Sequence, residues 1–486
     1  MTGAGRRLVG RGSIYTLGSA APMLAGLLVT PFLTRAAGVG EYGLISVAIT
    51  TMQWSLVVLT LGLPLVITRH ALTESTGTEG ARGLVLAGSV MALGAALLVA
   101  GGQHLAVALS GSSTPLAVTL GLVAGGLGAG IALTQAYAVA LEQAWFYVAL
   151  ATGPTLLAPA AGLLAVTLGD APSATRYFAA VAVVNAVTLG LGLLKVLGSG
   201  RTVLRWSDLT RAVRTSLPLV PHQFVTASAN GVGILVAAAV LGRGDGGRAQ
   251  VALYLGTVAL TLTSAVAYAW LPVLAREARE NRGEQLGETS RLVATLAALA
   301  TGGVALLSPW LLRVLVPPSF SIADMVPLVA AACLAAPLAA VYLAHYQLVV
   351  LSGRTAALAV LSPLAMVLGV ACSVVATRLV GLAGVGIGVA VTYALLWLLV
   401  RGLARRVDDV RWPEWSALPA VVVALVLCLA GGLLPVSGVA AVVVRGLLAV
   451  ATAAAGLAVL MRLFSAGGQA ADTVDDTVDG PVGEAS

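Results

Sequence analysis

Hydrophobic residues along this chain occur in long, nearly continuous runs separated by short polar stretches. A helix needs about 20 apolar residues to cross the hydrocarbon core of a bilayer, and by that measure the sequence predicts fourteen transmembrane helices. The predicted spans are residues 13–34, 42–68, 84–102, 115–140, 146–168, 176–197, 217–241, 250–274, 292–315, 325–351, 355–377, 380–400, 417–434 and 439–461. A β-barrel would instead show segments of about ten residues that alternate between apolar and polar. The pattern therefore predicts an all-α polytopic membrane protein.

Composition leads to the same class. The chain is 59% hydrophobic and 10% charged, whereas soluble domains carry about 25% charged residues. Arg6, Arg7 and Arg11 precede the first apolar run, but that run continues unbroken to Leu33. It is too long for the apolar region of a signal peptide, about 7–15 residues, so we expect the first helix to be retained.

The basic residues predict an orientation. With the N-terminus inside, 20 Lys and Arg residues fall in cytoplasmic segments and seven on the other side, which is the expected bias toward the cytoplasm. The richness in Arg, Ala, Gly and Val suggests a GC-rich bacterial genome. We therefore expect a multi-pass protein of the bacterial cytoplasmic (inner) membrane with both termini cytoplasmic. The net charge of +7 reflects this bias and an attraction to membrane lipids, so no nucleic-acid partner is predicted.

The chain divides into four parts along its length. We expect an N-terminal six-helix lobe (1–200), a C-terminal six-helix lobe (201–402), two additional transmembrane helices (403–463) and an acidic disordered tail (464–486). The tail has five acidic and no basic residues, which is typical of solvated, disordered segments. Between the lobes, the spacing of Trp206, Leu209 and Val213 fits either a short interfacial helix or an ordinary basic loop.

The two predicted lobes repeat a pattern of proline and glycine. Span 13–34 contains Pro22 and leads into a glycine-containing exit, and span 217–241 contains Pro218 and Pro221 and does the same. We expect Tyr42 and Tyr254 to open the helix that follows in each half. Paired helices interrupted by Pro and Gly at equivalent positions are the best sequence indication of a transporter's binding site.

Polar residues form a stripe on each of these two helices. On the first, Ser19, Pro22, Thr30 and Thr34 share one face with Arg35 at its outer end; on the second, His222, Gln223 and Asn230 lie together. They are either packing seams and interhelical hydrogen bonds or the walls of a central cavity that Pro22, Pro218 and Pro221 shape by bending the helices. His345, in span 325–351, is a further cavity candidate or a packing histidine.

Several kinds of chemistry have no residues to support them. No Asp or Glu falls inside the fourteen spans, so a carboxylate relay for protons or Na⁺ is not predicted. Cys333, Cys372 and Cys428 lack metal-type spacing. Phosphate-binding loops and hydrolase motifs are missing too. The sequence predicts no catalytic residues, no metal and no cofactor, and a protein that is not an enzyme.

Two segments resemble a known family. Residues 12–48, GSIYTLGSAAPMLAGLLVTPFLTRAAGVGEYGLISVA, resemble the first helix and loop of bacterial polysaccharide-export flippases of the multidrug/oligosaccharidyl-lipid/polysaccharide superfamily, with the pattern P-x-L-T-R-x-L-G-x-x-x-Y-G. The matching residues are Pro31, Leu33, Thr34, Arg35, Gly38, Tyr42 and Gly43, and Ala37 replaces the usual Leu. Residues 216–242 are similar to the seventh helix of that family through Leu217, Pro218, Pro221, His222, Leu241 and Gly242. Asn230 and Gly231 stand where the family often has a charged residue, so no charge role is carried over there.

The resemblance implies a fold of two facing six-helix lobes and a function. The implied function is flipping of a polyprenyl-diphosphate-linked oligosaccharide by alternating access, for cell-surface polysaccharide synthesis, beside glycosyltransferases or a polymerase of the same pathway. Arg35 then either snorkels to lipid head groups or offers its planar donor fork to the diphosphate. Alternatives are a drug/cation antiporter or a peptidoglycan-precursor flippase of the same superfamily, and a membrane glycan polymerase.

Overall fold

A computed structural model of the chain describes residues 3–110, 115–217, 220–264, 274, 280–352, 354–407 and 410–475. Within these ranges, the side chains of residues 3–24, 73, 106–110, 222, 226, 227, 229, 230, 355 and 462–475 lie outside the description. Pro218 lies outside the described residues altogether.

The described residues form helices and no strands, which confirms the predicted all-α polytopic membrane fold. The first half contains α1 (Gly3–Leu59), α2 (Leu63–Thr73), α3 (Gly77–Ser110), α4 (Leu116–Ala140), α5 (Ala144–Thr152), the π-helical turn η1 (Gly153–Leu157), α6 (Ala158–Thr167), α7 (Ala174–Gly198) and α8 (Trp206–Ser216). The second contains α9 (Val220–Val240), α10 (Arg243–Gly256), α12 (Arg282–Leu315), η3 (Pro318–Phe320), α13 (Ile322–Cys333), α14 (Ala335–Leu351), η4 (Thr355–Ala357), α15 (Leu358–Val380), α16 (Ala383–Val407), η5 (Glu414–Ala417), α17 (Leu418–Leu433) and α18 (Val439–Asp475).

Eleven described segments are long and apolar enough to cross a membrane. The prediction of fourteen differs for identifiable reasons. Span 13–34 and the first part of span 42–68 fall in α1, whose helical geometry is interrupted at Gly38, where φ is 68° and ψ is 176°, so the two count as one segment. Span 217–241 is shortened because part of α9 lies outside the described side chains, and span 250–274 runs past the described residues.

Several predicted boundaries were wrong. Span 42–68 ends at Leu59, where Leu61 and Gly62 take positive φ angles of 50° and 69° and start α2 in a new direction. Span 325–351, by contrast, matches the apolar segment Ile322–Leu351, within which Leu334 separates α13 from α14. The predicted loop before span 250–274 is helical from Arg243 on, so Tyr254 lies near the end of α10 and does not open it. Glycine-rich sequence becomes helical here because tertiary packing overrides intrinsic propensity.

Two further segments, one left open between helix and loop and one expected to be disordered, contain helix in their described residues. Residues 206–216 form α8, with Leu209 and Ala212 buried, and Leu209 packs in the cluster that contains Leu63 and Ile67 of α2. The ordinary-loop interpretation was therefore wrong. The tail differs as well: α18 continues to Asp475, so the first part of 464–486 is helical where we expected disorder. Extending an existing helix avoids the cost of nucleating a new one.

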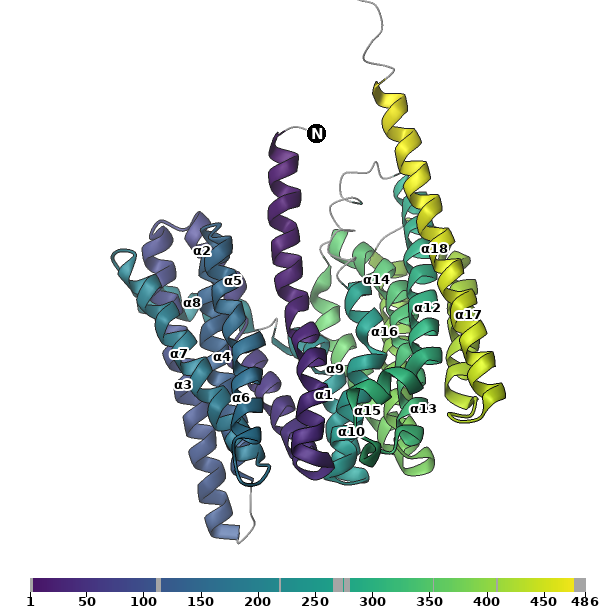
Figure 1. Cartoon of the computed structure of the whole chain (residues 1–486). Coiled ribbons are helices and arrows are strands. Elements are labelled where there is room, and N and C mark those ends of the chain that lie inside the picture. Colours follow the sequence, from purple (N-terminus) through teal and green to yellow (C-terminus); the bar gives the residue numbers. More distant parts are fainter. Residues whose placement is uncertain are drawn as a thin grey trace, which may run out of the picture.

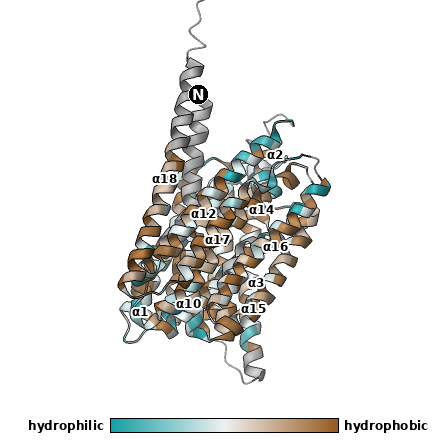
Figure 2. Cartoon of the chain, turned by 90° about the vertical axis from the view of Figure 1, so that its right-hand side faces the viewer, coloured by the Kyte–Doolittle hydropathy of each residue, from teal (hydrophilic) through white to brown (hydrophobic). Residues whose placement is uncertain are grey.

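The helices lie in two groups with α1 between them. Helices α2–α8 gather on one side and α9–α18 on the other, with α17 and α18 at the outer flank beside α12 (Figure 1). Hydrophobic residues cover most of the helix lengths, whereas hydrophilic residues gather near their ends (Figure 2). That distribution fits helices that lie within a bilayer.

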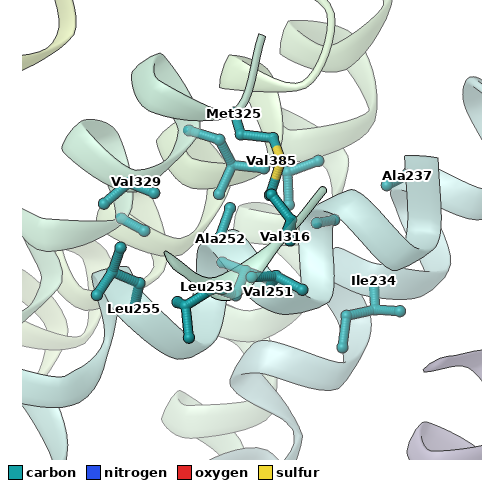
Figure 3. Packing of buried hydrophobic residues seen from close by; sticks show 14 of the residues in the cluster. Ile234, Ala237, Val251, Ala252, Leu253, Leu255, Val316, Met325, Val329 and Val385 are labelled. Atoms are coloured by element: carbon teal, nitrogen blue, oxygen red, sulfur yellow. The ribbon is translucent and has the colours of Figure 1, made fainter. Parts of the chain in front are cut away.

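The largest core cluster joins α10 to its neighbours. Val251, Ala252 and Leu253 of α10 are fully buried and lie among Ile234, Met325, Val329 and Val385 (Figure 3). The same cluster includes Tyr42 of α1 and Tyr177 of α7. Helix α10 packs against α1 on one side and against α9, α12 and α13 on the other, and it carries residues to the site described next.

Candidate functional site

The bend of α1 ties together helices that are far apart in the sequence. Just before Gly38, the Thr34 hydroxyl donates to the Leu315 carbonyl (2.8 Å), and the Arg35 guanidinium donates to the carbonyls of Pro31 (2.6 Å) and Val314 (3.0 Å). Val314 and Leu315 are in the last turn of α12, where backbone carbonyls lack helical partners and carry partial negative charge. Thr34 and Arg35 therefore cap α12.

Just after Gly38, the chain holds the start of another helix. A carboxylate oxygen of Glu41 accepts a hydrogen bond of 2.6 Å from the backbone N–H of Ala174, the first residue of α7. A carboxylate at a helix N-terminus satisfies a free donor and complements the helix dipole. The next residue, Tyr42, is buried and packs edge-on against Phe320 with ring centroids 5.9 Å apart.

The turn between α9 and α10 repeats this bend. Residues 38–43 read G-V-G-E-Y-G and residues 242–247 read G-R-G-D-G-G, so both follow the pattern G-x-G-acid-x-G. Both turns open on a glycine with positive φ, 68° at Gly38 and 119° at Gly242. This correspondence of six residues supports the predicted repeat of the two halves.

The two bends pack directly against each other. A Cβ on Gly43 would overlap the backbone carbonyl of Arg243, and a Cβ on Gly247 would lie 3.0 Å from the backbone nitrogen of Gly43. A Cβ on Gly244 would lie 2.8 Å from the Val39 side chain. Only glycine allows these backbones to approach so closely, and the start of α10 therefore sits against α1.

A cavity of about 170 Å³ lies beside this contact. Its walls come from α1, α4, η1, α6, α7 and α10, so α1 contributes residues from both sides of its bend. The polar residues that line it are Thr30, Tyr42, Gln53, Thr155, Tyr177, Asn185, Gln250 and Tyr254. Among the lining residues that the structure describes, none is charged.

Two amides in this cavity have unused hydrogen-bonding capacity. Gln250 donates to the Tyr254 hydroxyl (2.9 Å) and Asn185 donates to the Ala124 carbonyl (3.3 Å). Their amide oxygens are buried without a partner in the described part of the chain. Buried polar atoms are normally satisfied, so these two oxygens are exceptions with free acceptor capacity. The cavity can therefore donate and accept hydrogen bonds without presenting a charge.

The structure disperses the residues that the sequence singled out. Thr30 lines the cavity, and its hydroxyl donates to the Gly26 carbonyl (2.6 Å). Arg35 lies at the bend and is exposed. Ser19 and Pro22 lie in α1, and His222 and Asn230 in α9, at positions without described side chains. Gln223 is half-buried in α9, and Pro221 is the second residue of that helix. The roles of these residues stay predictions.

His345 lies away from this cavity, in a cluster on the far group of helices. Its Nδ1 bonds the Val341 carbonyl (2.9 Å), its ring is 4.9 Å from that of Trp412, and its Nε2 is 3.8 Å from a carboxylate oxygen of Glu414. Glu414 also receives hydrogen bonds from Arg401 (2.6 Å) and Arg405 (3.0 Å). This arrangement fits the packing interpretation of His345.

Five polar residues of the cavity, Gln53, Thr155, Tyr177, Asn185 and Gln250, were not indicated by the sequence pattern. Tyr177 and Asn185 sit in a span with no recognised polar stripe, and Gln250 follows the glycine-rich turn. One signal was present: Asn185 is one of three asparagines in the chain and the only one in the first six predicted spans. An amide inside a membrane span favours a partner or a ligand.

Comparisons with known proteins give a fold but no family. No protein-family model matches the chain, and no curated protein matches it either. Among solved structures, it is similar to an inward-facing multidrug resistance MATE family transporter of the MOP superfamily (TM-score 0.62, 14% identity, covering 80% of this chain and 97% of that chain). It is also similar to the lipid II flippase MurJ in an inward closed conformation (0.60, 12%, 92% and 99%) and to the MATE multidrug transporter DinF-BH in complex with R6G (0.56, 19%, 83% and 96%).

These structures define the class of fold. The chain has the fold of the MOP superfamily transporters and is a multi-pass membrane protein. At identities under 25%, the likeness concerns the fold alone, and activity has to be argued from the site.

Proposed function

We propose that this protein is a membrane transporter that flips a polyprenyl-diphosphate-linked oligosaccharide across the bacterial cytoplasmic membrane by alternating access. The observation that carries the proposal is the chemistry of the cavity. Hydroxyls of Tyr254 and Thr30 and the amides of Asn185 and Gln250 suit the hydroxyl groups of a sugar, and no described lining residue offers a carboxylate to a cation.

The size of the cavity constrains the mechanism. At about 170 Å³, it is smaller than the roughly 300 Å³ at which small-molecule pockets begin. An oligosaccharide would therefore enter only if the surrounding helices move apart. The α1 bend is the natural place for such a movement, because its residues contact α7, α10 and α12 together.

A second candidate is a flippase for a peptidoglycan precursor. The lipid II flippase aligns with 92% of this chain, whereas the two MATE transporters align with 80% and 83%. The flippase thus accounts for more of the chain than the drug transporters do. This coverage concerns the fold alone, so the assay below separates the two glycan classes from each other and from a drug or cation.

The remaining elements of the proposal concern context. The protein would lie with both termini in the cytoplasm, and the glycosyltransferases or polymerase that make and extend the glycan would be its pathway partners. No metal or cofactor enters the proposed mechanism.

Purified protein in vesicles tests the function directly. Vesicles would carry fluorescent lipid-linked oligosaccharide, lipid II or a lipophilic cation, each with and without ion gradients. We expect Tyr254→Phe and Asn185→Ala to slow glycan translocation by about fivefold each, the effect of losing a hydrogen bond worth about 1 kcal/mol. Ser290→Ala, which removes a buried hydroxyl of α12 outside this cavity, is the matched control. Cation transport without movement of either glycan would contradict the proposal.

Arg35 provides a second test. If its guanidinium binds the diphosphate, Arg35→Ala abolishes transport and Arg35→Lys keeps part of it, because the charge survives without the planar donor fork. Thr34→Val removes the neighbouring bond to α12 but keeps the arginine. Equal loss of transport in Thr34→Val and Arg35→Ala, at matched amounts of folded protein, would show that Arg35 acts only by capping α12.

A further inference from the structure

A polar pocket and an apolar groove meet on the outer face of α5 and α7. The pocket, of about 400 Å³, is lined by Tyr137, Gln143, Phe146, Leu194, Lys195, Val196, Gly198 and Ser199. The groove, of about 470 Å³, is lined by Phe146, Ala149, Leu150, Gly153, Leu157, Val183, Val184, Val187, Thr188, Leu191, Gly192 and Lys195. Phe146 and Lys195 belong to both, so the two form one continuous depression.

The pocket is positively charged. Lys195 is exposed, and its ammonium lies 5.5 Å from the centre of the Phe146 ring. Among the described residues, it makes no ion pair. Behind the pocket wall, buried Arg82 donates to the Tyr137 hydroxyl (3.0 Å) and the Ser199 hydroxyl (3.1 Å). No described lining residue is acidic, although Glu142 precedes Gln143 in the chain.

The groove faces the surroundings of the helices. Val183, Val187 and Leu191 of α7 lie on its wall and are exposed by 62%, 55% and 64%. Glycines at two positions let the helices below the groove pack closely. A Cβ on Gly153 would overlap the Thr188 hydroxyl, and one on Gly192 would lie 2.8 Å from Leu150. An exposed apolar groove of this kind within a membrane span is in contact with lipid chains.

The length of the groove matches one leaflet. From Val183 to Lys195, α7 rises by about 18 Å at about 1.5 Å per residue. Half of a hydrocarbon core of about 30 Å is roughly 15 Å. A molecule with one charged phosphate and chains of about that length fits the depression, whereas the long tail of a polyprenyl carrier would extend far beyond it.

We propose that this depression is a binding site for an anionic phospholipid of the adjoining leaflet. The phosphate lies by Lys195, within reach of the amide of Gln143 and in the field of Arg82. One acyl chain follows the groove between α5, η1 and α7. The inference depends on the membrane location of the chain and is independent of which cargo the protein transports.

The chain offers an unusual probe, because Lys195 is its only lysine. Full-length protein would be placed in phosphatidylcholine nanodiscs with or without phosphatidylglycerol, and amine-reactive labelling of Lys195 would be followed by peptide mass spectrometry. We expect phosphatidylglycerol to slow labelling of Lys195 and leave that of the N-terminal amine unchanged. Equal labelling rates in both membranes would contradict the site.

Native mass spectrometry of retained phosphatidylglycerol tests the two halves of the site. Lys195→Ala should weaken binding about fivefold, the effect of one basic residue near a lipid surface, and Lys195→Arg should restore it. Val187→Trp should fill the groove and weaken binding while the charge is kept. Arg354→Ala, an exposed arginine elsewhere, and Val375→Trp, a 59% exposed valine of α15, are matched controls.

Two outcomes would overturn the assignment. Retention that is the same in Lys195→Ala and Arg354→Ala would mean that the lysine binds no lipid. The second measurement uses polyprenyl phosphate as a competitor. If it displaces phosphatidylglycerol at equal concentration, and if Lys195→Ala weakens its binding, the site belongs to the carrier and not to the membrane phospholipid.

Discussion

Two bends, at residues 38–43 and 242–247, share one backbone pattern, but their side chains make different contacts. Both begin with a glycine of positive φ and place an acidic residue three positions later. In the first, Glu41 reaches out to the start of α7, and Tyr42 fills the space between the cavity and Phe320. In the second, Asp245 pairs locally with Arg248 (2.8 Å), and Gly246 leaves room for α9.

The comparison separates what the fold requires from what the site adds. The glycines are needed in both bends, because they set the chain direction and let α1 and α10 touch. The side chains differ because only the first bend adjoins the cavity and three other helix ends. The candidate site therefore adjoins only one copy of a repeated backbone unit, as expected where sites are grafted onto folds.

Breaking the contact between the bends should have the largest effect on stability. Gly43→Ala places a methyl group against the Arg243 carbonyl, and we expect a loss of about 1–3 kcal/mol, typical of overpacking. Gly40→Ala lies in the same bend with no atom within 4 Å of its Cβ and serves as the control. Thermal unfolding in detergent measures both. Equal melting temperatures for the two variants would show that the contact between the bends can relax.

Substituting the first glycine of each bend should have a matched effect at the two positions. Gly38→Ala (φ 68°, ψ 176°) and Gly242→Ala (φ 119°, ψ 166°) force a side chain into a backbone region essentially restricted to glycine, at about 1–3 kcal/mol each, and neither Cβ meets another atom within 4 Å. We therefore expect similar losses of thermal stability. A large loss at one position only would contradict the equivalence of the two bends.

Substituting the acidic residue of each bend should cause the smallest losses of stability, and these losses should have different causes in the two bends. Glu41→Gln weakens a charge-assisted bond to a helix N-terminus, and we expect a loss of about 1 kcal/mol. Asp245→Asn removes a partly exposed local ion pair, for which about 0.5 kcal/mol or less is expected. Melting curves in detergent measure both losses of stability. The loss caused by Asp245→Asn should be smaller in high salt. A larger effect of Asp245→Asn would reverse the comparison.

Hydrophobic patterning predicted most of the fold because long apolar runs leave few alternatives to membrane helices. It could not predict the breaks at Leu61 and Leu334, which interrupt runs whose hydropathy does not change, whereas Gly38 lies in the predicted connection between spans 13–34 and 42–68. It also treated residues 243–249 as a loop, because the packing that makes them helical involves α1, far away in the sequence. Local pattern contains no information about such contacts.

The candidate site was predicted in part. Of the predicted cavity residues, Thr30 lines the cavity; Tyr42 and Tyr254, which the sequence indicated only as openings of helices, line it too. Asn185 and Gln250 were missed because neither belongs to a polar stripe that the sequence pattern singled out, and only the folded chain shows that both residues line one cavity. His345 was indistinguishable from a cavity residue until Trp412 and Glu414 were placed beside it.

The π-helical turn η1 is a shared wall. Its Pro154 and Thr155 line the inner cavity, whereas its Gly153 and Leu157 line the outer groove, and π-helical turns are frequent at functional sites. A wall one helix thick cannot change shape on one face alone. If cargo and lipid favour different shapes of this turn, each changes the affinity of the other by the same factor. Membrane composition would then act as an effector of this protein, and cargo in the cavity would in turn select the lipid outside.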